Sequence, residues 1–161
     1  MNPNHHRWRA FRKGFAMHVV LKSNVQVFYG NRSKITIDWI LSHFGKHFEV
    51  KIYHRALVGN HLHLILLPKD NAKLSGFLRV VAGQISAKLW KNNSPFWKSR
   101  PWSRIVHWGK HYSTAIKYVA LNYLEGTKQI IRSKNARSEL HRYARAIQEV
   151  LEDGLTQPPP S

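Results

Sequence analysis

The sequence predicts an α+β fold in which an antiparallel sheet carries helices on one face, with further helices at the C-terminal end. Strand-like and helix-like segments follow one another in the order β-α-β-β-α-β-α-α. A Gly59-Asn60 pair between two strand-like segments marks a tight hairpin. The 161 residues are enough for one domain with its own core. The first six segments match the ferredoxin-like (RRM-like) split βαβ arrangement, which leaves the second sheet face free.

The first half of the chain supplies three strands and one helix. Residues 16–22 (AMHVVLK) are rich in β-branched side chains and predict a strand. After a turn-rich stretch, Ser33 can cap a helix whose apolar residues recur at helical spacing. These apolar residues are Ile37, Ile40, Leu41 and Phe44. Residues 49–58 and 61–67 then alternate as two strands around the Gly59-Asn60 turn.

The second half supplies one strand and three helices. Asn71 opens a helix that the segment 92–95 (NNSP) stops. Its apolar side consists of Leu74, Phe77, Leu78, Val81, Ile85 and Leu89. A strand is expected over 96–108, bulged at Pro101 because proline cannot donate to a ladder. Helices are expected over 111–125, ending near Gly126, and over 135–152, ending at Gly154. The last helix has Leu140, Tyr143, Ala144, Ile147 and Val150 or Leu151 on its apolar side.

These segments divide the chain into three parts. Residues 1–14 form a basic aromatic arm, residues 15–126 the main domain, and residues 127–161 a C-terminal helix with a disordered tail.

Charge is the most distinctive feature of the composition. Lysine and arginine number 26 against 8 acidic residues, a formal net charge of +18, which predicts a polyanionic partner, most often nucleic acid. The chain is 43% hydrophobic and 12% aromatic, which argues against a disordered basic tail. It has no cysteine, which excludes disulfides and thiolate sites and fits a reducing cytoplasm. Together with the expected nucleic-acid partner, this predicts a cytoplasmic, nucleoid-associated protein. We expect no membrane span, since no apolar run approaches roughly 18 residues, and no signal peptide.

The few acidic residues exclude one kind of nucleic-acid chemistry. Two-metal nucleases need several carboxylates at one site. The acids here are Asp38, Glu49, Asp70, Glu125, Glu139, Glu149, Glu152 and Asp153. The last four crowd into one C-terminal segment that is typical of a surface helix. Eleven histidines are therefore the better source of metal ligands.

The first candidate site is the pair His61 and His63 at the head of a predicted strand. Side chains alternate across a strand, so both imidazoles point to one face, close enough to share a metal ion. The intervening leucines, Leu62, Leu64 and Leu66, then point toward the helices. An isolated pair of this kind is more often a solvated strand face than a metal site.

The second candidate is Tyr118 with Asn122, four residues apart and hence on one helix face. A tyrosine can attack a phosphodiester, and an amide oxygen can complete a metal site made by two imidazoles. Because the unperturbed pKa of tyrosine is about 10, the phenol needs help from a metal or from Lys117 or Lys110. The alternative is that Tyr118 and Tyr123 are ordinary core or interface residues of an amphipathic helix.

The third candidate is the interleaving of basic and aromatic residues around Trp8 and Phe11 and again around Trp97 and Trp102, although several tryptophans belong to the core. Stacking faces plus cations are what single-stranded nucleic acid requires. The predicted nucleic-acid contacts are Arg7, Trp8, Arg9, Arg12, Arg79, Lys88, Lys91, Lys98, Arg100 and Arg104.

Four motifs together resemble a known family. The segments MHVVLKS, GNHLHLIL, FWKSRPWSRIV and KYVALNYLEG agree in order and spacing with those of the single-tyrosine HUH transposases, in particular the REP-associated tyrosine transposases. The resemblance covers about residues 15–126. It departs from the family at Tyr123, where a proline is usual, and at Val58 and Gly59, which replace methionine and proline.

The resemblance implies a mechanism and a set of residues. His61 and His63 match the metal ligands, Asn122 a third ligand, and Tyr118 the nucleophile. One Mg²⁺ or Mn²⁺ would serve cleavage of single-stranded DNA beside a hairpin, leaving a 5′-phosphotyrosine that a second 3′-OH can reverse. Independently of the resemblance, we expect the basic arm and the helix from Asn71, through Arg79, Lys88 and Lys91, to bind the hairpin backbone. No small-molecule cofactor is implied, and the resemblance leaves a homodimer open.

Other functions remain open at the level of sequence. A domesticated relative would bind hairpin DNA without cutting it. An RNA-binding ferredoxin-like module would explain charge and fold equally well, but would make the alignment of the four site residues a coincidence. The two-histidine phosphoesterases need two HxT/S motifs, which this chain lacks.

Overall fold

The structure is a computed structural model that describes residues 10–131 and 140–153. Arg7, Trp8 and Arg9 of the predicted arm lie outside the described residues. So do residues 135–139 of the expected last helix, its expected end at Gly154 and the predicted tail.

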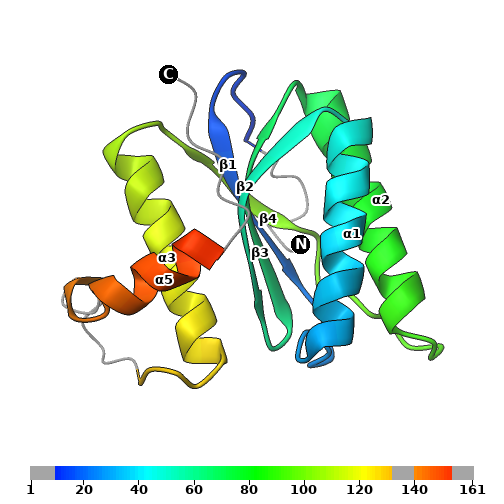
Figure 1. Cartoon of the computed structure of the whole chain (residues 1–161). Helices are drawn as coiled ribbons and strands as arrows, with labels where there is room; N and C mark the ends of the chain where they lie inside the picture. The colour runs from blue at the N-terminus through cyan, green and yellow to red at the C-terminus, as the bar shows by residue number, and fades with distance from the viewer. Residues whose placement is uncertain (1–9, 132–139, 154–161) are drawn as a thin grey trace, which may run out of the picture.

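A four-stranded sheet forms the centre of the molecule (Figure 1). Its strands are β1 (Ala16–Lys22), β2 (Val50–Val58), β3 (His61–Pro68) and β4 (Trp102–Val106). They lie in the order β2-β3-β1-β4, and every neighbouring pair is antiparallel. This is the strand order of the split βαβ arrangement, so the predicted ferredoxin-like α+β fold is confirmed.

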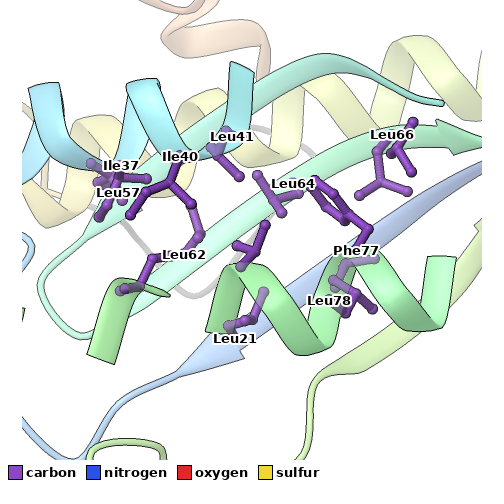
Figure 2. Close-up of a cluster of buried hydrophobic side chains, with 14 of the residues drawn as sticks. Leu21, Ile37, Ile40, Leu41, Leu57, Leu62, Leu64, Leu66, Phe77 and Leu78 are labelled. Carbon is purple, nitrogen blue, oxygen red and sulfur yellow. The ribbon is translucent and has the colours of Figure 1, made fainter. Parts of the chain in front are cut away.

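Two helices, α1 (Asn31–His47) and α2 (Asn71–Leu89), cover one face of the sheet. Their apolar stripes and the strand residues of that face form one continuous core. Figure 2 shows Leu62, Leu64 and Leu66 of β3 in this core beside Ile40 and Phe77, and all five side chains are fully buried. The alternation predicted for residues 61–67 is therefore confirmed.

A third helix, α3 (Lys110–Gly126), lies on the opposite face of the sheet (Figure 1). It packs on Tyr53, Ala56 and Ile65 through Tyr112, Ala115 and Val119. The helix α5 (Ala144–Asp153) in turn packs on α3, where Ile147 and Leu151 are buried. The expectation of a free second face was therefore wrong on the β2 side, where the apolar residues Tyr53 and Ala56 are buried under α3.

Three predicted boundaries need correction. The helix α1 begins at Asn31 rather than at a Ser33 cap, because the Ser33 hydroxyl donates to the Val27 carbonyl instead. The strand expected over 96–108 shrinks to five residues, β4, with an isolated bridge between Ser23 and Trp97 upstream. Pro101, which has no N–H to donate, stands just before β4. Within the described part of the helix expected over 135–152, a turn at Tyr143 separates the helical residues 140–142 from α5.

The junction between α3 and the sheet depends on Gly126. A Cβ added at this position would lie 3.1 Å from Val58 Cβ and 3.5 Å from Val58 Cα. We expect Gly126→Ala to lower the free energy of unfolding by about 1–3 kcal/mol through this steric clash. Gly83 of α2 is the matched control, since a Cβ there meets nothing within 4 Å. Gly83→Ala should stabilise the protein by about 0.5–1 kcal/mol. Urea unfolding followed by circular dichroism measures both, and equal midpoints for the two variants would contradict the packing described.

His54 of β2 is buried to 1% exposure, and burial lowers its pKa from 6.5 to about 4, with Arg55 as a second cause. Because the folded-state pKa lies below the unfolded value, this histidine contributes stability above pH 6.5 that is lost as the pH falls toward 4. At pH 5 the loss amounts to about 2 kcal/mol. We expect His54→Leu to lose about that much less stability than wild type between pH 7.5 and pH 5. Urea unfolding of both proteins at the two pH values measures it, and identical losses would disprove the assignment.

Candidate active site

The paired histidines of β3 lie on the sheet face that carries α3. In the antiparallel register, His61 stands opposite Lys22 of β1, and His63 opposite Val20. Residues directly opposite in an antiparallel pair share a face. Leu62, between them, is fully buried on the other side. The two imidazoles therefore share one face, as the sequence predicts.

Tyr118 of α3 lies across a cavity from these histidines. The cavity has a volume of about 780 Å³, and its walls come from β1, β3, β4 and α3, with Ser99 and Leu140 added from outside these elements. His61, His63 and Tyr118 all line it. Tyr118 is 38% exposed, and its ring centroid lies 6.4 Å from that of His18. Three of the four predicted site residues are thus brought together, from segments more than fifty positions apart.

A third histidine, His18 of β1, belongs to the same cavity and was missed by the sequence reasoning. Its Nε2 lies 3.2 Å from His63 Nδ1, and the two rings stack with centroids 5.5 Å apart. His18 is only 2% exposed. In the tautomer in which His63 donates from Nδ1, its Nε2 keeps a lone pair for a metal. The signal was available, because His18 sits in the strand motif MHVVLKS, but no local spacing links it to His63.

All three histidines of the cavity favour the neutral form. Burial is the largest cause for each. It lowers the pKa of His18 to about 3, with His63 and Arg104 as further causes. It lowers the pKa of His63 to about 4, with His61 contributing. The pKa of His61 is lowered too, by burial and then by Lys22 and Lys98. Because only neutral imidazoles bind metal, the lowered pKa values favour these histidines as metal ligands rather than as positively charged groups.

Cations and an indole ring surround the histidines. Lys22 and Arg104 line the cavity. Trp102 of β4 lines it as well, is 54% exposed and meets His18 edge to face at 5.6 Å. The Arg104 guanidinium lies 5.9 Å from the Trp102 ring centroid. A phosphate beside Lys22 and Arg104, with a base on Trp102, fits this combination.

Asn122 is the predicted site residue that the structure does not bring to the cavity wall. It follows Tyr118 by one turn of α3 and is partly buried, but it is not among the residues that line the cavity. Within the described residues, no group of three or more His, Cys, Asp or Glu side chains is gathered to hold a metal. The donors do fit a divalent cation in kind: two neutral imidazoles, one of them oriented by His18. A third ligand requires Asn122 or the substrate itself.

The other predicted nucleic-acid contacts that lie within the described residues fall into three groups. Arg104 lines the cavity, and Lys98 and Arg100 are exposed in the loop that leads into β4. Arg79 and Lys88 lie exposed on α2 and Lys91 just after it, beyond the opposite sheet face. Arg12 is exposed with its guanidinium 4.4 Å from the Phe15 ring centroid and does not line the cavity.

The fold and the cavity define a ferredoxin-like α+β domain with a histidine cluster facing a helix-borne tyrosine. The family model for IS200-like transposases matches residues 12–134. The chain belongs to the IS200-like transposase family.

Solved structures agree with this assignment at the level of the fold. One is a REP-associated tyrosine transposase solved with a REP hairpin, 17% identical over 74% of this chain and 73% of that one, with a TM-score of 0.63. Another, from Deinococcus radiodurans R1 and only provisionally assigned as a transposase, is 13% identical over 70% of this chain and 93% of that one, with a TM-score of 0.50. No curated protein matches the chain. Among the described residues, no helix is long and apolar enough to cross a membrane.

Proposed function

We propose that the chain is a metal-dependent DNA transesterase that cleaves and rejoins single-stranded DNA beside hairpins through a 5′-phosphotyrosine. One observation carries the proposal: Tyr118 and the neutral pair His61 and His63 line the same cavity. Membership of a transposase family and the hairpin bound to the REP-associated relative support DNA as the substrate.

The chemistry follows from the residues in the cavity. Lys22 and Arg104 hold the scissile phosphate, and Trp102 stacks with a neighbouring base. Tyr118 attacks phosphorus in line: the bond from its Oη to phosphorus forms while the bond to the 3′ oxygen breaks. The phenol gives up its proton and the departing 3′ oxygen gains one, so a free 3′-OH results. A Mg²⁺ or Mn²⁺ ion held by His61, His63 and Asn122 would polarise the phosphate and stabilise the departing oxygen.

Rejoining is the reverse of the same step. The phosphotyrosine retains an ester bond of similar energy, so a second 3′-OH can displace Tyr118 and join a new strand. The steps need neither water nor a carboxylate base, which agrees with a cavity wall free of aspartate and glutamate in the described part of the chain.

The test is a cleavage assay with the full chain. The probe is a pool of single-stranded oligonucleotides in which a fixed hairpin lies between randomised arms, with Mn²⁺ or EDTA. We expect a 3′-labelled pool to yield a slower-migrating labelled protein on a denaturing gel with Mn²⁺ only. A 5′-labelled pool should yield shortened DNA that a polymerase can extend. Label transfer from the 5′ side would overturn the proposed polarity.

A binding protein that does not cut is the second candidate, because no group of three or more His, Cys, Asp or Glu side chains in the described residues is gathered to hold a metal. Retention of the hairpin in a mobility shift, with no adduct from any member of the pool, would favour this function over cleavage.

A further inference from the structure

A second cavity of about 430 Å³ lies at the free edge of the sheet, along β2. It is bordered by the N-terminal end of α1, the C-terminal end of α3 and α5. The two cavities have no lining residue in common. The helix α3 borders both, since Tyr118 lines the first and Tyr123 the second.

His54 forms part of the wall of this second cavity, and its buried ring nitrogens lack hydrogen-bond partners among the described residues. It is 1% exposed, and neither of its ring nitrogens has a hydrogen-bond partner in the described part of the chain. A buried polar group without a partner costs about 1–3 kcal/mol. Because its lowered pKa keeps it neutral, the imidazole offers one N–H donor and one acceptor. One donor beside one acceptor matches the edge of a nucleobase, which also has both. A simple anion offers acceptors only.

The N-terminal end of α1 adds a place for a negative charge. The 17-residue helix begins after Gly30, whose φ of 94° suits glycine, with no side-chain cap and no acidic residue in its first turn. Its first backbone N–H groups are therefore available to an anion. Lys34, one turn into the helix, lines the same cavity.

The remaining lining residues favour a nucleotide over a bare phosphate. Arg55, which also lines the cavity, already forms an ion pair with Asp38 and donates a hydrogen bond to its carboxylate. Glu149 also lines the cavity and is held by Arg145 at 3.3 Å, so it repels a bare anion but accepts a hydrogen bond from a base amine. Tyr29, which is 53% exposed, and Tyr123 add aromatic faces for stacking.

We propose that this cavity binds one unpaired nucleotide, its phosphate at the start of α1 beside Lys34 and its amine-bearing base against Tyr29, His54 and Glu149. The proposal rests on the proposed function for the source of that nucleotide, which is the single-stranded arm of the DNA substrate. A DNA strand bound in this cavity is held at one border of α3. Its scissile phosphate then lies in the first cavity, at the other border of α3, beside Tyr118.

The first measurement uses free ligands and needs neither metal nor cleavage. Full-length ¹⁵N-labelled protein is titrated with dAMP, with dTMP and with inorganic phosphate, and the imidazole ¹⁵N signals of His54 are followed by NMR. We expect dAMP to shift these signals and to bind several-fold more tightly than inorganic phosphate and dTMP. Equal binding of inorganic phosphate and dAMP would reduce the site to an anion site and overturn the nucleotide proposal. No saturable shift with dAMP would overturn it as well.

The second measurement identifies DNA as the source. Fluorescence polarisation compares a hairpin carrying a randomised single-stranded arm with the same hairpin lacking it. We expect His54→Leu to weaken binding of the armed hairpin by about tenfold and Lys34→Gln by about threefold. Neither variant should change binding of the bare hairpin. Lys46→Gln, which removes the same charge at the exposed end of α1, is the matched control and should change neither.

The two proposals can fail separately. Tyr118→Phe should bind dAMP as wild type does, so an absent phosphotyrosine adduct leaves the nucleotide site testable. If His54→Leu and Lys34→Gln weaken dAMP binding but not binding of the armed hairpin, the site serves a free nucleotide and the DNA assignment is wrong. His54→Leu removes polar atoms that have no partner in the described residues, so we expect it to keep the fold. Urea unfolding of the variant, measured before its binding is compared, separates a loss of binding from a loss of the fold.

Discussion

Replacing Tyr118 with phenylalanine is expected to lower the yield of the covalent protein–DNA adduct by a factor on the order of 10³ or more, while leaving hairpin affinity unchanged. The substitution removes a single oxygen atom, and that atom is the proposed nucleophile. The aromatic ring that lies 6.4 Å from His18 remains in place. Because Tyr118 is 38% exposed, its hydroxyl is not part of a sealed core, and we expect the fold to survive. The readout is the labelled adduct on a denaturing gel beside a mobility shift on the same DNA.

Two other tyrosines of α3 are the controls for this result. Tyr123→Phe removes a phenol from the same helix but from the wall of the other cavity, and should keep the adduct. Tyr112 is buried in the apolar contact between α3 and the sheet, and burial, with Tyr53 as a further cause, raises its pKa to about 12. It is therefore a poor nucleophile. An adduct that persists in Tyr118→Phe and disappears in either control would move the nucleophile to that residue.

Local periodicity predicted those parts of the site that lie within single elements. The two-residue repeat of a strand is enough to place His61 and His63 on one face and Leu62 on the other, and the structure agrees. Helical spacing likewise places Tyr118 on a helix that ends at Gly126. In both cases the pattern repeats over a few positions, so no knowledge of distant segments is needed.

Contacts between distant segments could not be predicted in this way. His18 and His63 lie 45 positions apart in the sequence and are brought together by the pairing of β1 with β3. The register of that pairing depends on the whole sheet, so local spacing cannot predict the contact. The position of α3 on the second face depends on the burial of Tyr53 and Ala56, apolar residues that a strand pattern alone does not assign to a partner. The wall of the second cavity likewise needs His54, Lys34 and Glu149 from three separate elements.

Removing His63 is the second change with a large expected effect, because this imidazole is both a proposed metal ligand and the partner of His18. We expect His63→Ala to abolish the adduct. We also expect it to weaken Mn²⁺ binding beyond detection, as measured by electron paramagnetic resonance of the protein without DNA. His18→Ala should weaken Mn²⁺ binding by about 10- to 100-fold, the usual effect of losing a group that orients a ligand. His43→Ala, on the exposed side of α1, is the matched control and should bind Mn²⁺ as wild type does.

A folding defect can be separated from the loss of a ligand. In His63→Ala the buried Nε2 of His18 loses its partner, which costs about 1–3 kcal/mol of stability. His63→Asn keeps a polar group beside His18 but lacks the imidazole lone pair, so it should regain part of that stability without regaining Mn²⁺ binding. Mn²⁺ affinity that is unchanged in both His63 variants would place the metal elsewhere in the protein. Affinity that follows unfolding stability, rather than the identity of the side chain, would make His63 a structural residue.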